Sequence, residues 1–249
     1  MEVRIAHLYA DLMNIYGDRG NIIVLTRRAQ WRGISVIVTP IGLGDALEWR
    51  QFDLIFVGGG QDRQQALMAR DLATTKSDGL LAARDDGRVI LAVCGGYQLL
   101  GRFYRGADGE ELPGIGLFDL QTTHPGTRLA RCTGDVLVRC DWHPRRRGLV
   151  GFENHGGRTY LGPEAQSLGT VVVGHGNNGA DRTEGARMAN AYGTYLHGSL
   201  LPKNPWFADH LLIEALRRRY GPAALLAPLD NSLEAAAHDA MEARLLARR

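Results

Sequence analysis

Lysine and cysteine are both scarce in this chain of 249 residues. Its 29 basic residues include only two lysines, Lys76 and Lys203, so arginine carries nearly all of the positive charge. The three cysteines, Cys94, Cys132 and Cys140, are widely spaced and form no C-x-x-C pair, which argues against a disulfide framework and against a zinc knuckle. We therefore expect reduced cysteines in a reducing, cytoplasmic setting, and no metal site.

Long apolar runs and strong net charge are missing as well. No run approaches the roughly 20 apolar residues that span a bilayer, and the first residues enter a strand pattern without the apolar core of a signal peptide. The net charge of +2 gives no field that would attract nucleic acid. We expect neither membrane insertion nor a nucleic-acid partner.

Phosphate-binding loops are the third absence. Gly58-Gly59-Gly60 is rich in glycine, but no lysine follows it, and neither G-x-x-x-x-G-K-[ST] nor G-x-G-x-x-G occurs there. The sequence therefore disfavours nucleotide binding and predicts no cofactor in this chain.

The first hundred residues alternate strand and helix patterns, which is typical of a parallel sheet with right-handed crossovers. The β-branched run 34–41 predicts a fully buried strand. Strands are predicted at 3–9, 34–41, 52–57 and 89–93, and helices at 21–31 and from 61 to about 84.

After residue 114 the pattern changes to short strands divided by glycine-rich turns, which indicates antiparallel structure that continues the same sheet or forms an appended one. A helix at 206–220 is closed by Gly221-Pro222, and a last helix is predicted from Asn231, which has capping-box spacing with Glu234. The short strands are predicted at 115–122, 134–139, 149–152, 170–173 and 193–196.

These patterns favour an α/β fold with a mostly parallel central sheet, flanking helices and an antiparallel extension. We interpret residues 1–249 as a single domain that ends in a helical extension at about 205–249. A chain of this length can bury a substantial core.

Cys94 follows the apolar strand pattern 89–93 and precedes Gly95-Gly96 and a short apolar helix pattern. This arrangement predicts a thiol on a sharp strand-to-helix turn, where the helix N-terminus favours the thiolate and backbone N–H groups can receive an oxyanion. The alternative is a buried structural cysteine, because free cysteine is among the most buried residue types.

Gly58-Gly59-Gly60 also follows a predicted strand, so it should lie on the same sheet edge as Cys94. We expect this loop (Gly59 or Gly60) and Gly95 to supply the backbone donors of an oxyanion hole. The alternative for the loop is an ordinary strand-to-helix turn.

A thiol nucleophile usually needs a base, and His197 stands out among the eight histidines because it ends the strand pattern that begins at Tyr192 and precedes Gly198. His155 is its main rival. The other six histidines have no comparable signature, and a solvated or structural role is the ordinary one for each.

Together these features resemble the class I glutamine amidotransferases. Within that family they resemble the cobyric acid synthase branch, and most closely the glutaminase subunits of lipid II isoglutaminyl synthase (the GatD type). The ordered set of motifs spans almost the whole chain and is far more specific than the cysteine turn alone. The segments that carry the resemblance are 16–22, 57–66, 93–98, 151–159, 174–178, 193–198 and 201–204.

The resemblance implies that Cys94 is the nucleophile, that His197 is the general acid/base and that Arg128 holds the glutamine substrate. A guanidinium suits an α-carboxylate, although a solvated surface charge is the ordinary role of an arginine in so arginine-rich a chain. The resemblance further implies a heterodimer with a Mur-ligase-like partner that uses ATP to amidate D-glutamate in lipid II, in the bacterial cytoplasm at the inner face of the membrane.

One departure from the wider family leaves a question open. Many class I amidotransferases carry a glutamate two residues after the histidine, and this chain has Ser199 there. Either a Cys–His dyad suffices, or an acid from elsewhere orients the ring; Glu153 and Asp18 lie in family-like motifs, but the sequence places neither near His197. Two further readings are a different acceptor, such as a corrinoid, and an inactive scaffold subunit.

Overall fold

Three β-sheets and the helices around them make up the computed structural model, which describes residues 1–60, 62–126, 129–144, 147–197 and 200–247. Short 3₁₀ turns lie at Ile15–Gly17 and Trp49–Gln51. A π-helical segment, Leu72–Lys76, joins α2 (Asp62–Asp71) to α3 (Ser77–Asp85). The elements are β1 (Glu2–Leu8), α1 (Arg19–Gln30), β2 (Ser35–Ile41), β3 (Leu54–Val57), α2 (Asp62–Asp71), α3 (Ser77–Asp85), β4 (Val89–Val93), α4 (Gly95–Leu99), β5 (Phe103–Arg105), β6 (Glu111–Pro113), β7 (Leu120–Thr123), β8 (Cys132–Cys140), β9 (Arg147–His155), β10 (Arg158–Leu161), β11 (Gly169–Val173), β12 (Thr183–Glu184), β13 (Ala186–Met188), β14 (Ala191–Thr194), α5 (Leu200–Lys203), α6 (Pro205–Tyr220) and α7 (Ser232–Leu246).

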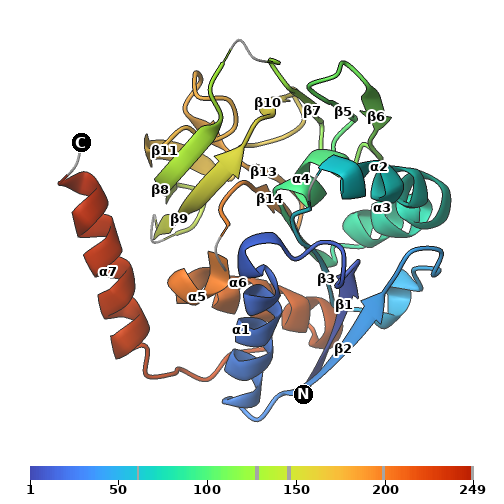
Figure 1. The fold of residues 1–249 in the computed structure, drawn as a ribbon. Helices are drawn as coiled ribbons and strands as arrows, with labels where there is room; N and C mark the ends of the chain where they lie inside the picture. The colour runs from blue at the N-terminus through green and yellow to red at the C-terminus, as the bar shows by residue number, and fades with distance from the viewer. Residues whose placement is uncertain (61, 127–128, 145–146, 198–199, 248–249) are drawn as a thin grey trace.

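The largest sheet has the strand order β13-β14-β4-β3-β1-β2, and all its neighbouring strands run parallel except β13 and β14. Helices α1 and α6 cover one face of it, and α2 and α3 lie on the other (Figure 1). Right-handed crossovers require this, because β1 connects to β2 in one direction along the sheet and β3 connects to β4 in the other. The predicted parallel sheet with flanking helices is confirmed.

Strands β3 and β4 lie at the centre of this sheet, and every one of their residues is buried. Helices on both faces account for their continuous apolar sequences. Their carboxyl ends are in register with those of β1 and β14: Leu8 pairs with Val57, Val57 with Ala92, and Thr194 with Val93. The loops that follow these four strands therefore leave the sheet along one edge.

The prediction that β2 is fully buried is wrong. Among the described residues this strand pairs only with β1 and is the edge of the sheet, where Ile37 is 44% exposed and Val38 is 36% exposed. Its β-branched composition suits any pleated strand and does not distinguish an edge from a centre. Pro40, which has no N–H to donate, is consistent with an edge position.

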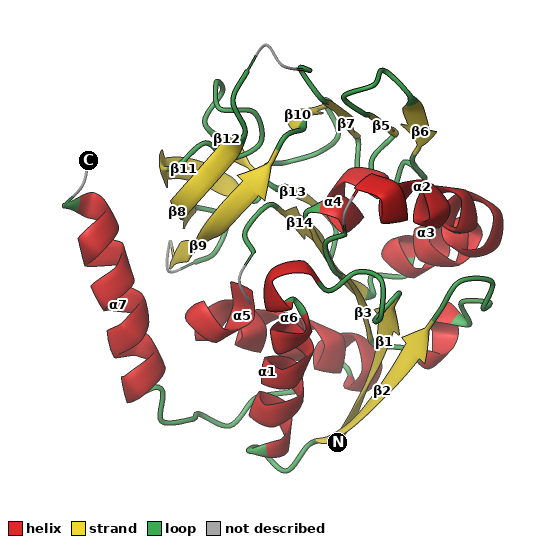
Figure 2. Ribbon diagram, in the orientation of Figure 1, coloured by secondary structure: helices red, strands yellow, loops and turns green. Residues whose placement is uncertain are grey.

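The second half of the chain both extends the main sheet, through β13 and β14, and builds two appended four-stranded sheets. One has the order β10-β7-β5-β6 and the other β12-β11-β8-β9, and their pairs are antiparallel except β5 with β7. Figure 2 shows the strands of the two appended sheets gathered at the top of the view, with α1, α5 and α6 at the opposite end. Both alternatives that the sequence left open are therefore present.

Three predicted details differ from the structure. Only Leu120–Thr123 is a strand within the region around the predicted 115–122. Strand β14 ends at Thr194, so His197 lies three residues beyond the strand. Asn231 is the N-cap of α7 but forms no capping box, because its side-chain oxygen accepts a hydrogen bond from Arg28 at 2.9 Å.

The two C-terminal helices differ in their environment. Helix α6 is part of the main core, with Phe207, Leu211 and Leu212 completely buried, and it ends at Gly221 with the positive φ of +94° expected of a helix stop. Helix α7 stands at the side of the molecule and packs chiefly through Met241 and Leu245 (Figure 1). Among the described residues no helix is long and apolar enough to cross a membrane.

Candidate active site

Cys94 occupies the strained turn that its sequence context predicts. Its φ of +47° and ψ of −105° lie outside the regions that L-residues ordinarily adopt, and its N–H donates to Thr194 O at 2.8 Å, which fixes the turn to β14. A Cβ added at Gly96 would lie 2.7 Å from Val57 Cγ1 and 2.8 Å from Gly58 O, so only glycine lets α4 start this close to β3. The two loops predicted to share an edge are therefore in contact.

His197 lies at the same edge and is held by its backbone. Its N–H donates to Phe152 O at 2.6 Å in an isolated antiparallel bridge with β9, and the side chain is 1% exposed. A Cβ added at Gly59 would lie 3.0 Å from His197 Cε1 and 3.4 Å from Cys94 Cβ. Gly59 is thus packed between the predicted nucleophile and the predicted base.

Asp18 is the acid that the structure brings to His197. It lies in the turn between β1 and α1, is completely buried, and its Oδ1 is 3.9 Å from His197 Nδ1. Its Oδ2 accepts a hydrogen bond from Gly59 N–H at 2.7 Å. Asp18 Oδ1 and both ring nitrogens of His197 have no hydrogen-bond partner within the part of the chain that the structure describes.

The surroundings of His197 shift its pKa strongly. Burial alone would lower this pKa, but the sulfur of Cys94 and the carboxylate of Asp18 outweigh burial and raise it to about 10. An imidazolium is therefore stabilised next to Cys94 at neutral pH. A protonated imidazole beside the sulfur can act as a general acid toward a leaving group.

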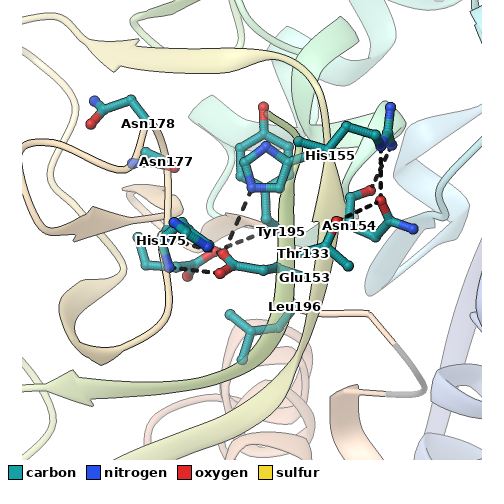
Figure 3. Close-up of polar contacts among 12 residues, drawn as sticks. Thr133, Glu153, Asn154, His155, His175, Asn177, Asn178, Tyr195 and Leu196 are labelled. Carbon is teal, nitrogen blue, oxygen red and sulfur yellow. Dashed lines mark hydrogen bonds and ion pairs between the residues drawn. The ribbon is translucent and has the colours of Figure 1, made fainter. Parts of the chain in front are cut away.

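His155, the rival histidine, is built into a different set of contacts (Figure 3). Its ring stacks on Tyr195 at 3.6 Å, its Nδ1 is 2.8 Å from Gly157 O, and its Nε2 is 3.7 Å from Glu153 Oε2. Burial lowers its pKa. The geometry favours His197 as the base because His155 is fixed on the wall of the site by neighbours other than the thiol.

Glu153, the second acid that the sequence left open, is bound by a different turn. Its two oxygens accept hydrogen bonds from the backbone N–H groups of His175 and Gly176 at 2.6 and 2.9 Å (Figure 3). This carboxylate holds the turn after β11 against β9. It therefore does not take the place of the family glutamate.

A cavity of about 420 Å³ opens onto Cys94 and His197. Its volume is within the range of small-molecule sites, about 300–1,000 Å³, and polar and apolar atoms contribute about equally to its walls. It is lined by Ile15, Tyr16, Gly60, Gln65, Cys94, Gln98, Tyr104, His124, Arg131, Asn154, His155, Gly156, Gly157 and His197.

A chain of buried hydrogen bonds supports the wall of this cavity, and the sequence reasoning did not anticipate it. Gln65 Nε2 donates to Gln98 Oε1 at 3.0 Å, and Gln98 Nε2 donates to Tyr195 OH at 3.0 Å. Tyr195 OH is in turn 2.6 Å from Thr159 Oγ1. The sequence signal for this chain of hydrogen bonds is weak. Gln65 lies in segment 57–66 and Gln98 in segment 93–98, both of which carry the family resemblance, but no sequence pattern pairs the two glutamines.

The three predicted oxyanion donors have different surroundings. Gly59 N–H already donates to the carboxylate of Asp18, so it is not available in this arrangement. Gly95 is the first residue of α4, whose N–H has no partner within the helix, and a Cβ added there would lie 3.0 Å from Gly60 N. The geometry favours Gly60 and Gly95 over Gly59 as the pair of donors.

Arg128 lies outside the residues that the structure describes. Arg131, three residues on, lines the cavity and is held by Asn154, whose Oδ1 accepts from Arg131 Nε at 3.0 Å. Asn154 Nδ2 donates to Tyr16 OH at 2.6 Å, which connects this wall to the turn before Asp18. The described part of the wall thus carries a guanidinium that the sequence reasoning did not name.

No group of three or more histidine, cysteine or acidic side chains among the described residues has the geometry to hold a metal ion. The described side chains and backbone at this site offer a thiol, an imidazole, a carboxylate and oriented amides. This set suits nucleophilic attack on a carbonyl carbon followed by proton transfer to a leaving group.

Comparison with known proteins gives a consistent result. The model of the CobB/CobQ-like glutamine amidotransferase domain matches residues 4–205. The chain is 44% identical to the GatD subunit of lipid II isoglutaminyl synthase (glutamine-hydrolyzing) from Staphylococcus aureus, over 88% of this chain and 86% of that one. It is 39% identical to the Streptococcus pneumoniae subunit of the same name, over 88% and 83%.

Among solved structures, a glutamine amidotransferase from Thermotoga maritima matches with a TM-score of 0.53 at 15% identity, over 98% of this chain and 92% of that one. That likeness concerns the fold alone. The family match covers most of the chain, including Cys94 and His197. This chain therefore belongs to the CobB/CobQ-like glutamine amidotransferase family.

Proposed function

We propose that this chain is the glutaminase subunit of a lipid II isoglutaminyl synthase, which hydrolyses the side-chain amide of L-glutamine and delivers ammonia to a second subunit. The observation that carries the proposal is the strained Cys94 turn beside the buried His197 in the wall of one cavity. The identity of 44% to the Staphylococcus aureus subunit, over most of both chains, supports this choice of acceptor.

In the proposed mechanism the Cys94 thiolate attacks the side-chain amide carbon of glutamine, and the N–H groups of Gly60 and Gly95 receive the oxyanion. His197 gives its proton to the leaving ammonia and then takes a proton from the water that hydrolyses the thioester. Arg128 keeps its proposed role of pairing with the α-carboxylate of the substrate, and Arg131 adds a second guanidinium to the wall.

The partner in this proposal is a Mur-ligase-like subunit that binds ATP, activates the α-carboxylate of D-glutamate in lipid II and captures the ammonia. No cofactor is proposed for this chain itself. We place the complex in the bacterial cytoplasm, at the inner face of the membrane, because lipid II is the acceptor.

The test is co-expression with the Mur-ligase-like partner, followed by amidation assays on lipid II. We expect the complex to amidate lipid II with glutamine and ATP, and the Cys94→Ala complex to do so only with an ammonium salt. Amidation of a corrinoid carboxylate in place of lipid II would reassign the acceptor. A wild-type complex that uses ammonium but never glutamine would show that this chain is a scaffold and would contradict the proposal.

A further inference from the structure

Asp18 is a buried carboxylate that the mechanism above does not use. It comes from the turn between β1 and α1, near the start of the chain, whereas the family pattern would place an acid two residues after His197, at Ser199, which lies outside the described residues. Glu153, the other candidate acid, is occupied by the backbone of His175 and Gly176. The carboxylate beside the imidazole is therefore that of Asp18, with Oδ1 3.9 Å from Nδ1.

We propose that Asp18 is the positioning residue of His197 and that the same carboxylate fixes the glycine loop, so that one side chain sets both the base and the oxyanion loop. The inference rests on the proposed glutaminase activity. A carboxylate at Nδ1 holds a proton on that nitrogen, which leaves Nε2 free to exchange a proton with Cys94.

The position of Asp18 is set by contacts on both sides of it. Ile15 N–H donates to Gly59 O at 3.2 Å, and Gly59 N–H donates back to Asp18 Oδ2 at 2.7 Å, so the turn and the glycine loop are joined in both directions. Tyr16, with φ of +56°, places its ring 5.0 Å from the ring of His197. The turn therefore touches His197 through a carboxylate and through an aromatic ring.

The distance of 3.9 Å between Asp18 Oδ1 and His197 Nδ1 is longer than a hydrogen bond, and a movement of roughly 1 Å would close it. Both atoms are buried, and neither has another partner in the described chain. Leaving them unpaired costs free energy, so a small closure is favoured. Hydrogen bonds of this kind are often long in unliganded sites and shorten when the substrate is bound.

The proton steps balance without protonation of Asp18. The thiol proton of Cys94 passes to His197 Nε2, and the carboxylate stabilises the imidazolium through the proton on Nδ1. The Nε2 proton then goes to the departing ammonia. Cys94, Asp18 and Tyr16 are the titratable groups that face or pack on the ring, and the first two hold its pKa above the ordinary value.

Asp18→Asn tests the role with little change in shape. The amide oxygen of asparagine still accepts from Gly59 N–H, but its NH₂ group now donates to His197 Nδ1 and forces the proton onto Nε2. We expect kcat for glutamine hydrolysis by the complex to fall about 10²- to 10⁴-fold with little change in KM. Asp18→Ser, which keeps an oxygen but no charge, should show a comparable loss, and Asp11→Asn, an exposed acid earlier in the same turn, should match the wild type.

Nitrogen NMR of His197 gives a readout that a merely structural role would not change. In the Asn variant the pKa of His197 should fall, and the neutral ring should carry its proton on Nε2 in place of Nδ1. A folded Asn or Ser variant that keeps kcat within about threefold, with an unchanged His197 titration, would overturn the inference. The NMR result does not depend on turnover, so it tests Asp18 even if the wild-type complex releases no ammonia, an outcome that would count against the proposed function alone.

Discussion

At the scale of single residues, the charge state of His197 is decided by its neighbours. Burial opposes the imidazolium, yet the sulfur of Cys94 and the carboxylate of Asp18 raise its pKa to about 10. A group with a raised pKa stabilises the fold fully below its ordinary value of 6.5, and this contribution is lost as the pH rises through about 10. The contacts of His197 with Cys94 and Asp18 therefore also stabilise the folded site at neutral pH.

Replacement of Cys94 separates these contributions. In Cys94→Ala the sulfur is gone while burial and Asp18 remain, so the pKa of His197 should fall well below about 10. Histidine NMR titration measures this shift directly. Cys132→Ala, another buried cysteine, is the control and should leave the titration unchanged; an identical His197 titration in the Cys94 variant would contradict the pairing.

Residues with a local signal were the ones that the sequence could predict. Cys94 and His197 follow strand patterns and precede glycines, and the structure places both at one edge of the sheet. Asp18 had no such signal, because its approach to His197 depends on how the turn after β1 folds onto the glycine loop. The same contact makes Gly60 a better candidate than Gly59 for the oxyanion donor from the glycine loop.

At the scale of elements, the segment that carries His197 is held by buried polar side chains. Glu184, at the end of β12, is completely buried and accepts hydrogen bonds from Tyr195 N–H at 2.8 Å and from Thr194 Oγ1 at 3.0 Å. Burial raises its pKa to about 8, although these two donors lower it. The carboxyl group is thus protonated at neutral pH. Its ionisation at higher pH puts a buried charge at the hydrogen bonds that hold the end of β14.

Glu184 should make stability depend on pH. Between pH 4.5 and about 8 the folded state keeps a proton that the unfolded chain releases, so the free energy of unfolding should fall as the pH rises, by up to about 1.4 kcal/mol per pH unit. Glu184→Gln cannot ionise at this position. In urea unfolding, its free energy of unfolding should therefore rise relative to that of the wild type as the pH increases from 5.5 to 8.5. A difference in free energy of unfolding between variant and wild type that does not change with pH would refute this. Glu110→Gln, on an exposed loop, is the surface control.

Asn204 connects the helical side of the molecule to β9. Its Oδ1 accepts from Val150 N–H at 2.9 Å, and its Nδ2 donates to Val150 O and to Leu200 O, both at 2.8 Å. The side chain is completely buried and takes the place of a neighbouring strand beside Val150. This contact gives a physical reason for an asparagine in segment 201–204, one of the segments that carry the family resemblance.

Asn204→Ala should therefore leave three backbone groups without partners and lower the free energy of unfolding by about 3 kcal/mol or more, because each buried unpaired group costs about 1–3 kcal/mol. Urea unfolding measures the change. Asn190→Ala, which loses a single partly buried hydrogen bond to Gly87 O, is the matched control and should cost about 1 kcal/mol or less. Equal effects of the two substitutions would show that the Val150 contact is not the source.

At the scale of the whole molecule, alternation of strands and helices was enough to predict the central parallel sheet. It was not enough to decide which strand is the edge, since β2 has the composition of a central strand. The antiparallel half was harder, because short strands between glycine turns fit several pairings. Its contribution to the site, through the bridge of Phe152 with His197 and the wall formed by His155, follows only from the folded arrangement.

The central claim is that Cys94 is a nucleophile for the side-chain amide of glutamine. It is tested most directly by mass spectrometry of the complex with its partner after exposure to diazo-oxo-norleucine, an electrophilic analogue of glutamine. We expect one adduct, on Cys94, that excess glutamine prevents and that leaves Cys132 and Cys140 unmodified. A complex in which Cys94 is not labelled, or is labelled equally well in the presence of excess glutamine, would contradict it.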